Sequence, residues 1–168
     1  NYSFRAEVPF DPKTDALFND YHVGGTTDGI LEMWTPTWKQ RGILEVKSIK
    51  ESGFDKLKDP KPEHLMQAHL YALRFDCPVI WIWYYCKNNS KRMVFTRIFD
   101  PKLANAALHK YEAWLKHAAD GTLPEREEHW YMCPRCEYRE HCKPQICTSQ
   151  SMNKITSNIR STGQLRRL

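Results

Sequence analysis

The stretch GILEVKS, Gly42–Ser48, decides the fold together with GGTTDGIL, Gly24–Leu31. Both stretches place charged side chains among apolar residues that suit a buried strand, and the turn-rich segment TPTWKQRG between them predicts a hairpin. Because side chains alternate along a strand, Glu45 and Lys47 are expected to point to one face of the sheet. Asp28 is expected beside Glu45 on the neighbouring strand.

Outside this hairpin, apolar periodicity and proline positions predict the element order β-β-β-α-β-β-α. The charged segment Glu51–Pro62 is expected to be a loop. The order fits an α/β fold in which helices flank a mixed central sheet. The expected strands are Tyr2–Phe10, His22–Trp34, Gly42–Ile49, Pro78–Cys86 and Lys91–Asp100, and the expected helices are Glu63–Phe75 and Pro101–Ala119.

Length and composition favour a single globular domain followed by a tail. The chain has 168 residues and a net charge of +5, and no run reaches the ~18 apolar residues of a membrane span. We expect one domain over 1–147, with a cysteine module at 130–147. The segment 148–168 is basic and is expected to be a flexible arm, either simply solvated or in contact with phosphates. No signal peptide is evident, which favours the cytoplasm. The chain begins with Asn1 inside a strand, so we expect a natural N-terminal segment to be missing.

The charged residues of the hairpin suit phosphodiester hydrolysis, which needs an activated water and neutralised phosphate charge. Asp28 and Glu45 offer the hard oxygen ligands that Mg²⁺ or Mn²⁺ prefers. Lys47 can orient the water or stabilise developing charge. Taken alone, an Asp-Gly turn or a Glu-x-Lys strand is more often structural. Charges embedded in apolar strands, however, usually have a partner or a metal, so the combination favours a metal site.

The segment QAHLY adds two polar residues on one helical face. Gln67 and Tyr71 are four residues apart, so their side chains lie side by side. Gln67 can bond a phosphate, a water or a metal-bound carboxylate, and Tyr71 can stack or donate its hydroxyl. The alternative is an ordinary amphipathic helix with an exposed Gln and a packed Tyr. His64 and His69 on this helix are expected to be surface residues.

The order Asp28, Glu45-x-Lys47, Gln67-x3-Tyr71 resembles the PD-(D/E)XK superfamily and, within it, the RecB-like nucleases. The resemblance implies a restriction-endonuclease-like core that cleaves DNA by a two-metal-type mechanism. It also implies the backbone carbonyl of Val46 as a further metal ligand. The family uses an additional upstream His or Glu, for which His22 is a weak candidate. The resemblance places that ligand on a helix before the first strand.

Four cysteines fall within fifteen residues, as Cys133, Cys136, Cys142 and Cys147. Disulfides are not expected in a cytoplasmic protein, which leaves zinc or an iron–sulfur cluster. The spacing C-x2-C-x5-C resembles the C-terminal triad of iron–sulfur exonucleases related to RecB, including AddB and the CRISPR-adaptation exonucleases. That resemblance implies a [4Fe–4S] cluster, with Zn²⁺ as the alternative. The fourth ligand is then either Cys147 or a residue of the missing segment.

Together these features predict a Mg²⁺- or Mn²⁺-dependent deoxyribonuclease, and an exonuclease is favoured. Its expected substrate is single-stranded DNA or duplex ends, in recombination, repair or replication in a bacterium or a phage-infected cell. It is expected to act alone or with a recombination or replication partner protein. Two alternatives stay open: a catalytically silent DNA-binding scaffold with a nuclease fold, and a restriction-type endonuclease.

Overall fold

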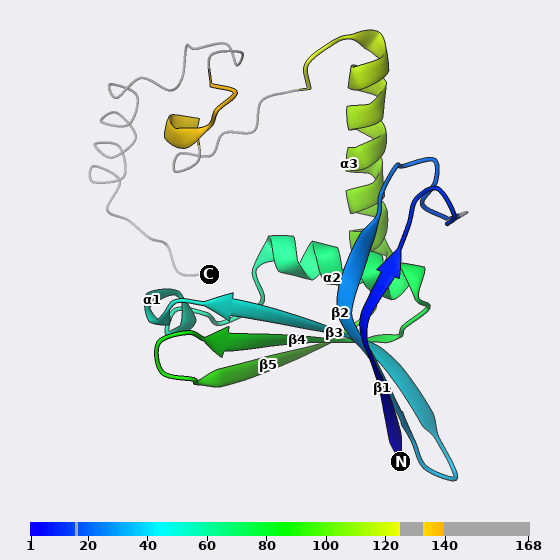
Figure 1. Ribbon diagram of the computed structural model, residues 1–168, viewed down its shortest axis with the longest axis vertical. Helices are drawn as coiled ribbons and strands as arrows, with labels where there is room; N and C mark the ends of the chain where they lie inside the picture. The colour runs from blue at the N-terminus through cyan, green and yellow to red at the C-terminus, as the bar shows by residue number, and fades with distance from the viewer. Residues whose placement is uncertain (16, 125–132, 140–168) are drawn as a thin grey trace, which may run out of the picture. The chain divides into compact units, whose positions relative to one another are not determined.

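The computed structural model describes residues 1–15, 17–124 and 133–139. Its contacts divide the chain into two compact units, Asn1–Thr122 and Leu123–Leu168. The first unit holds a five-stranded sheet and the helices α1, α2 and α3 (Figure 1). In the second unit, the described residues include a short 3-10 helix, η1, at Cys133–Arg135. No helix among the described residues is long and apolar enough to cross a membrane.

The sheet is mixed, and its strands lie in chain order. Neighbouring strands are antiparallel except β3 and β4, which are parallel. A parallel pair needs a crossover connection, and the segment that contains α2 supplies it. The predicted α/β fold with a mixed sheet flanked by helices is therefore confirmed. The strands are β1 Tyr2–Phe10, β2 Gly25–Trp34, β3 Lys39–Ile49, β4 Val79–Cys86 and β5 Arg92–Ile98.

Two of the helices were expected and one was not. Helix α2, Pro62–Arg74, packs against β3 and β4, and α3, Pro101–Asp120, packs against α2. Asp100 caps α3 by accepting the Lys102 N–H at 2.9 Å. The short helix α1, Glu51–Phe54, lies in the segment predicted to be a loop. Its last residue, Phe54, is buried in the core.

The core fills the space between α2 and the sheet. The even-numbered residues of β4 point into this space, and Ile80, Ile82 and Tyr84 are fully buried there. His69 of α2 is also buried, so its prediction as a surface residue is wrong. Its Nδ1 accepts the Asp100 N–H at 3.1 Å, which links α2 to the start of α3. The start of α3 is therefore held by a histidine from another helix.

The connection from β1 to β2 contributes to the core and contacts the end of α2. Asp15 is buried, accepts the N–H groups of Leu17 and Phe18 through Oδ1, and forms an ion pair with Arg74 at the end of α2. Phe18 is fully buried. Strand β2 begins only at Gly25, not at His22 as predicted.

Candidate active site

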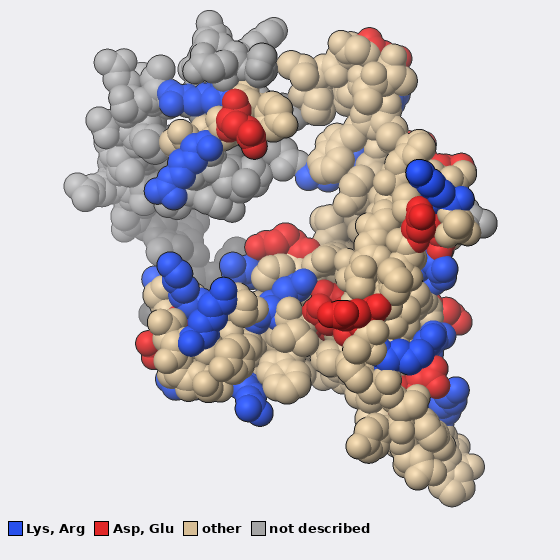
Figure 2. All heavy atoms as spheres, viewed as in Figure 1, with Lys and Arg blue, Asp and Glu red and all other residues tan. Residues whose placement is uncertain are grey.

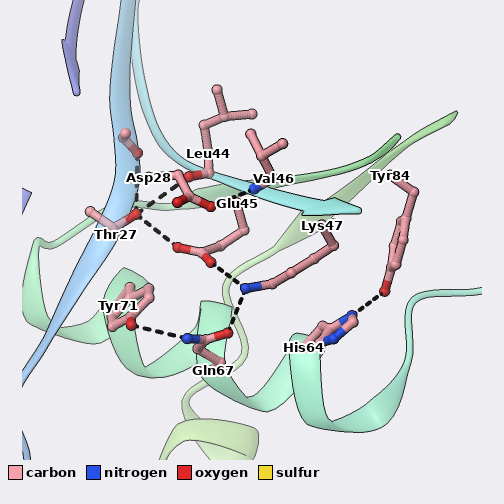
Figure 3. A network of polar contacts seen from close by, with 11 residues as sticks. Thr27, Asp28, Leu44, Glu45, Val46, Lys47, His64, Gln67, Tyr71 and Tyr84 are labelled. Atoms are coloured by element: carbon pink, nitrogen blue, oxygen red, sulfur yellow. Dashed lines mark hydrogen bonds and ion pairs between the residues drawn. The ribbon is translucent and has the colours of Figure 1, made fainter. Parts of the chain in front are cut away.

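Strands β2 and β3 stop pairing where the two predicted acids stand. Their ladder ends at the pair Gly29–Leu44, and Asp28 and Glu45 are the next residues of the two strands. From there β3 continues beside β4 and β2 continues beside β1. The strands therefore separate at this point, and the side chains of Asp28 and Glu45 lie at the opening (Figure 3).

Asp28 reaches across this opening to the backbone of β3. Its Oδ2 accepts the Val46 N–H at 2.7 Å. The N–H and C=O of one residue point to the same side of a strand, because a hydrogen-bonded pair of residues exchanges both bonds. The Val46 carbonyl therefore faces the same opening as Asp28. This is the carbonyl that was predicted as an additional metal ligand.

Glu45 is a buried carboxylate with two hydrogen-bond donors. Only 1% of the residue is exposed. Thr27 Oγ1 donates to Oε1 at 3.0 Å, and Lys47 Nζ donates to Oε2 at 2.9 Å. Burial raises the pKa of Glu45, and the negative charge of Asp28 adds to this, although Lys47 acts in the opposite direction. Additional positive charge at this point would therefore stabilise the ionised form.

Helix α2 holds Lys47 from the other side. Lys47 Nζ donates to Gln67 Oε1 at 2.7 Å, and Gln67 Nε2 donates to Tyr71 Oη at 3.0 Å. These two bonds fix which end of the Gln67 amide faces the lysine. Burial raises the pKa of Tyr71, so its hydroxyl stays protonated at neutral pH. Of the three N–H donors of the ammonium group, two are used by Glu45 and Gln67, and the third has no partner among the described residues.

The glycine at the start of β2 allows α2 to lie this close. A Cβ on Gly25 would stand 3.0 Å from Tyr71 Oη and 3.1 Å from its Cε1. That spacing is tighter than ordinary van der Waals contact, so a larger residue would displace the tyrosine that positions Gln67. The backbone of β2 therefore approaches α2 closely at this glycine, and the approach lies at the site.

The structure brings the five predicted catalytic residues into one neighbourhood, with Lys47 bonded to Glu45 and Gln67 (Figure 3). Sequence reasoning missed Thr27, which is fully buried and fixes one oxygen of Glu45. A threonine in a strand carries no distinguishing signal, because that residue type favours strands in general.

His22, the weak candidate for a further metal ligand, takes no part in the contacts described above. It lies in a turn with φ +51° and is exposed. The described ranges contain no group of three His, Cys, Asp or Glu residues suited to a metal. The donor set at the opening is two carboxylates and a backbone carbonyl. This set fits Mg²⁺, which is commonly held by one or two carboxylates and keeps several waters.

The cysteine module is described only in part. Cys133 and Cys136 lie at η1, where the Cys136 N–H donates to the Cys133 carbonyl at 3.3 Å. Cys142 and Cys147 lie outside the described residues, as does the basic tail, so the cluster stays a prediction. Cys77 and Cys86 are buried, and burial raises the pKa of Cys77 to about 11.

Comparison with known proteins does not identify a family for this chain. No family model matches the chain, and no curated protein matches it significantly. Among solved structures, the chain is similar to the crystal structure of SSO0001, with a TM-score of 0.44 and 15% sequence identity over 72% of this chain. The matched part spans 50% of that protein. A similarity at this level carries no argument about function.

Proposed function

We propose that this chain is a metal-dependent deoxyribonuclease with a RecB-like PD-(D/E)XK core, acting as an exonuclease. One observation carries the proposal: Asp28 and Glu45 meet where β2 and β3 separate, and Lys47 is hydrogen-bonded to Glu45. Burying a carboxylate beside a second acid lowers the folding stability of a protein, so the arrangement calls for a functional reason. A bound divalent cation would offset the two negative charges and provides that reason.

In this proposal Asp28, Glu45 and the Val46 carbonyl hold Mg²⁺ or Mn²⁺. When bound, the ion supplies an activated water and neutralises charge on the phosphate. Asp28 can contribute its second oxygen while Oδ2 keeps the Val46 N–H, since each carboxylate oxygen has its own lone pairs. Glu45 is already held in place by Thr27 and Lys47, so little side-chain freedom is lost on binding.

Lys47 acts on the phosphate in this scheme. Its remaining N–H can donate to the attacking water or to a phosphate oxygen, where negative charge increases during the reaction. Gln67 and Tyr71 act through Lys47: the chain of hydrogen bonds fixes the ammonium group at one position. In this scheme both are positioning residues, because Gln67 bonds Lys47 directly and Tyr71 bonds Gln67.

DNA is the proposed substrate, and exposed lysines offer contacts to its backbone. They gather on the part of the first unit that carries α1 and the turn between β4 and β5 (Figure 2). The two segments are joined, because Asn88 Oδ1 accepts the Glu51 N–H at 3.0 Å. The lysines of this region are Lys50, Lys56, Lys58, Lys87 and Lys91. Cleavage should therefore weaken as salt concentration rises.

The proposal includes a [4Fe–4S] cluster, or Zn²⁺, held by Cys133, Cys136 and Cys142. It is supported by the cysteine spacing alone. The cluster would be supported by a visible absorption band and by bound iron and sulfide in the wild-type protein, all of which decrease together in Cys136→Ser. Zinc in place of iron would replace it with a zinc site, and an unchanged metal content would contradict the ligand assignment.

The nuclease proposal is tested with end-labelled DNA. Linear and circular DNA, each single- and double-stranded, is incubated with the full chain and Mg²⁺, Mn²⁺ or chelator. We expect metal-dependent loss of linear DNA, and none with Lys47→Ala. The matched control is Lys39→Ala on the same strand, because Lys39 is exposed and pairs with Glu32 away from the site. Cleavage of circular single-stranded DNA would indicate an endonuclease. Intact DNA with folded, metal-supplied protein would indicate a silent scaffold.

A further inference from the structure

His64 lies on the same face of α2 as Gln67, one turn earlier in the helix (Figure 3). Residues three apart on a helix are neighbours, so His64 borders the site. The positive charge of Lys47 acts on it directly. The residue is half-buried, so part of it is accessible to a ligand. None of the roles assigned above uses this side chain.

Hydrogen bonds around Tyr84 define which ring nitrogen of His64 carries the proton. Tyr84 Oη lies 3.0 Å from the Lys61 backbone nitrogen and 2.8 Å from His64 Nδ1. A backbone N–H can only donate, so Oη accepts it and must find an acceptor for its own proton. His64 Nδ1 is that acceptor. The reverse assignment would leave the hydroxyl proton of a fully buried tyrosine unpaired, which is costly.

The neutral ring therefore carries its proton on Nε2. Burial lowers the pKa of His64, and the charge of Lys47 lowers it further, so the ring is neutral at pH 7. Tyr84 also packs against the ring, with the centroids 5.6 Å apart. The result is a fixed, uncharged N–H donor at the border of the site. It cannot act as a base at that nitrogen, but it can bind an acceptor.

We propose that His64 is a substrate-binding residue, whose Nε2–H donates to an oxygen of a DNA phosphate next to the scissile one. This inference rests on the proposed nuclease function. Phosphate oxygens in a DNA strand are hydrogen-bond acceptors only, which matches a group that can only donate. Lys47 serves the scissile phosphate, and His64 sets the position of the strand one linkage away. Tyr84 is then a positioning residue that orients the donor.

Binding of modified oligonucleotides tests the contact. The full chain is titrated, with Ca²⁺ replacing Mg²⁺, with fluorescent single-stranded oligonucleotides that carry one uncharged methylphosphonate linkage at successive positions. At one position we expect the modification to weaken wild-type binding about ten-fold, which is about 1.4 kcal/mol. His64→Ala should weaken binding of the unmodified strand by a similar factor, and the modification should then add nothing. A purely structural His64 would give independent, additive losses at every position, which would overturn the proposal.

Three variants sharpen the test. His64→Gln keeps an N–H donor near the position of Nε2 and should recover part of the affinity. His109→Ala, an exposed histidine of α3, is the matched control and should bind like wild type. Tyr84→Phe removes the hydroxyl that selects the tautomer, and should weaken binding less than His64→Ala.

Nitrogen-15 spectra of the histidine rings test the tautomer without DNA. Wild type should show His64 protonated at Nε2, and a proton on Nδ1 would overturn the inference. Failure of this inference is distinguishable from failure of the nuclease proposal. A wild-type protein that cleaves DNA, with His64→Ala binding every oligonucleotide equally well, overturns only the role of His64. A wild-type protein that binds none of the oligonucleotides and cleaves none of the linear DNA overturns both.

Discussion

Substitution of Glu45 by glutamine should abolish metal-dependent cleavage and yet stabilise the metal-free protein. The reason is the raised pKa of Glu45, caused first by burial and then by the charge of Asp28, despite the contact with Lys47. An acid whose folded-state pKa is raised binds its proton more tightly in the folded state than in the unfolded chain. Stability is then highest below the unfolded pKa of about 4.5 and falls as pH rises towards the folded pKa. Above the folded pKa, the loss of folding stability caused by ionising Glu45 has reached its full value.

The direction of the effect follows from the local contacts. Glutamine keeps the size of the side chain, and its oxygen can still accept from Lys47. Its amide N–H₂ can face Thr27, whose hydroxyl is able to accept. Because glutamine has no charge to bury, we expect Glu45→Gln to be more stable than wild type in chelator at pH 7, with a higher Tm.

Metal should reverse the ranking. Binding to the folded state alone stabilises a protein by about 2.7 kcal/mol at a concentration one hundred times Kd. Wild-type Tm should therefore rise by roughly 8–16 °C with saturating Mn²⁺, and the Glu45→Gln protein should gain much less. The assay is a thermal melt with chelator or Mn²⁺ at several pH values. The difference between the two proteins in chelator should vanish below pH 4.5.

Glu32→Gln is the matched control for this comparison. Glu32 lies on β2 of the same hairpin and pairs with Lys39 and Arg41 at the surface. It should change Tm slightly and keep both cleavage and the response to Mn²⁺. If Glu45→Gln is less stable than wild type in chelator at pH 8, the argument from burial is wrong. If it keeps the full response to Mn²⁺, Glu45 is not a metal ligand.

The other site residues make separate predictions. Asp28→Ala should abolish cleavage and also destabilise the metal-free protein by about 1.5–3 kcal/mol in urea unfolding, because the Val46 N–H loses a charged acceptor; unchanged stability would contradict that bond. Gln67→Leu should lower kcat at least ten-fold with little change in DNA affinity, because Lys47 loses one of its two holding bonds. A rise in KM alone would instead make Gln67 a substrate contact. Thr27→Val keeps the shape but leaves a carboxylate oxygen without its donor, so Mn²⁺ affinity should change in calorimetry while the fold is retained.

Local periodicity explains how much of the site could be predicted. Alternation along one strand placed Glu45 and Lys47 on the same face, and a spacing of four residues placed Gln67 beside Tyr71 on the helix. Both relations depend only on neighbouring residues in the chain, so the sequence pattern carries them. The mixed sheet followed from element order, because the helix between two strands permits a parallel pair.

The remaining features depend on partners far away in the chain. The separation of β2 from β3 follows from pairing with β1 on one side and β4 on the other, which no local pattern records. His69 is of a polar residue type that is expected at the surface, and its bond to the Asp100 N–H explains why it can be buried. Asp15 is a similar case. It is a polar residue in a connection, and it is buried because it forms an ion pair with Arg74, the last residue of α2.

The network also explains why the proposed metal ligands are in place before a metal binds. Asp28 uses one oxygen for the Val46 N–H, and its other oxygen has no hydrogen bond among the described residues. Glu45 is held through both oxygens by donors that can remain while a cation approaches, since each oxygen has two lone pairs. Pre-organisation of this kind lowers the entropy lost on binding and keeps Lys47 aligned. Burial of Glu45 therefore lowers the stability of the metal-free protein, but it holds the site residues in fixed positions. The bonds from Thr27, Gln67 and Tyr71 serve this fixed geometry.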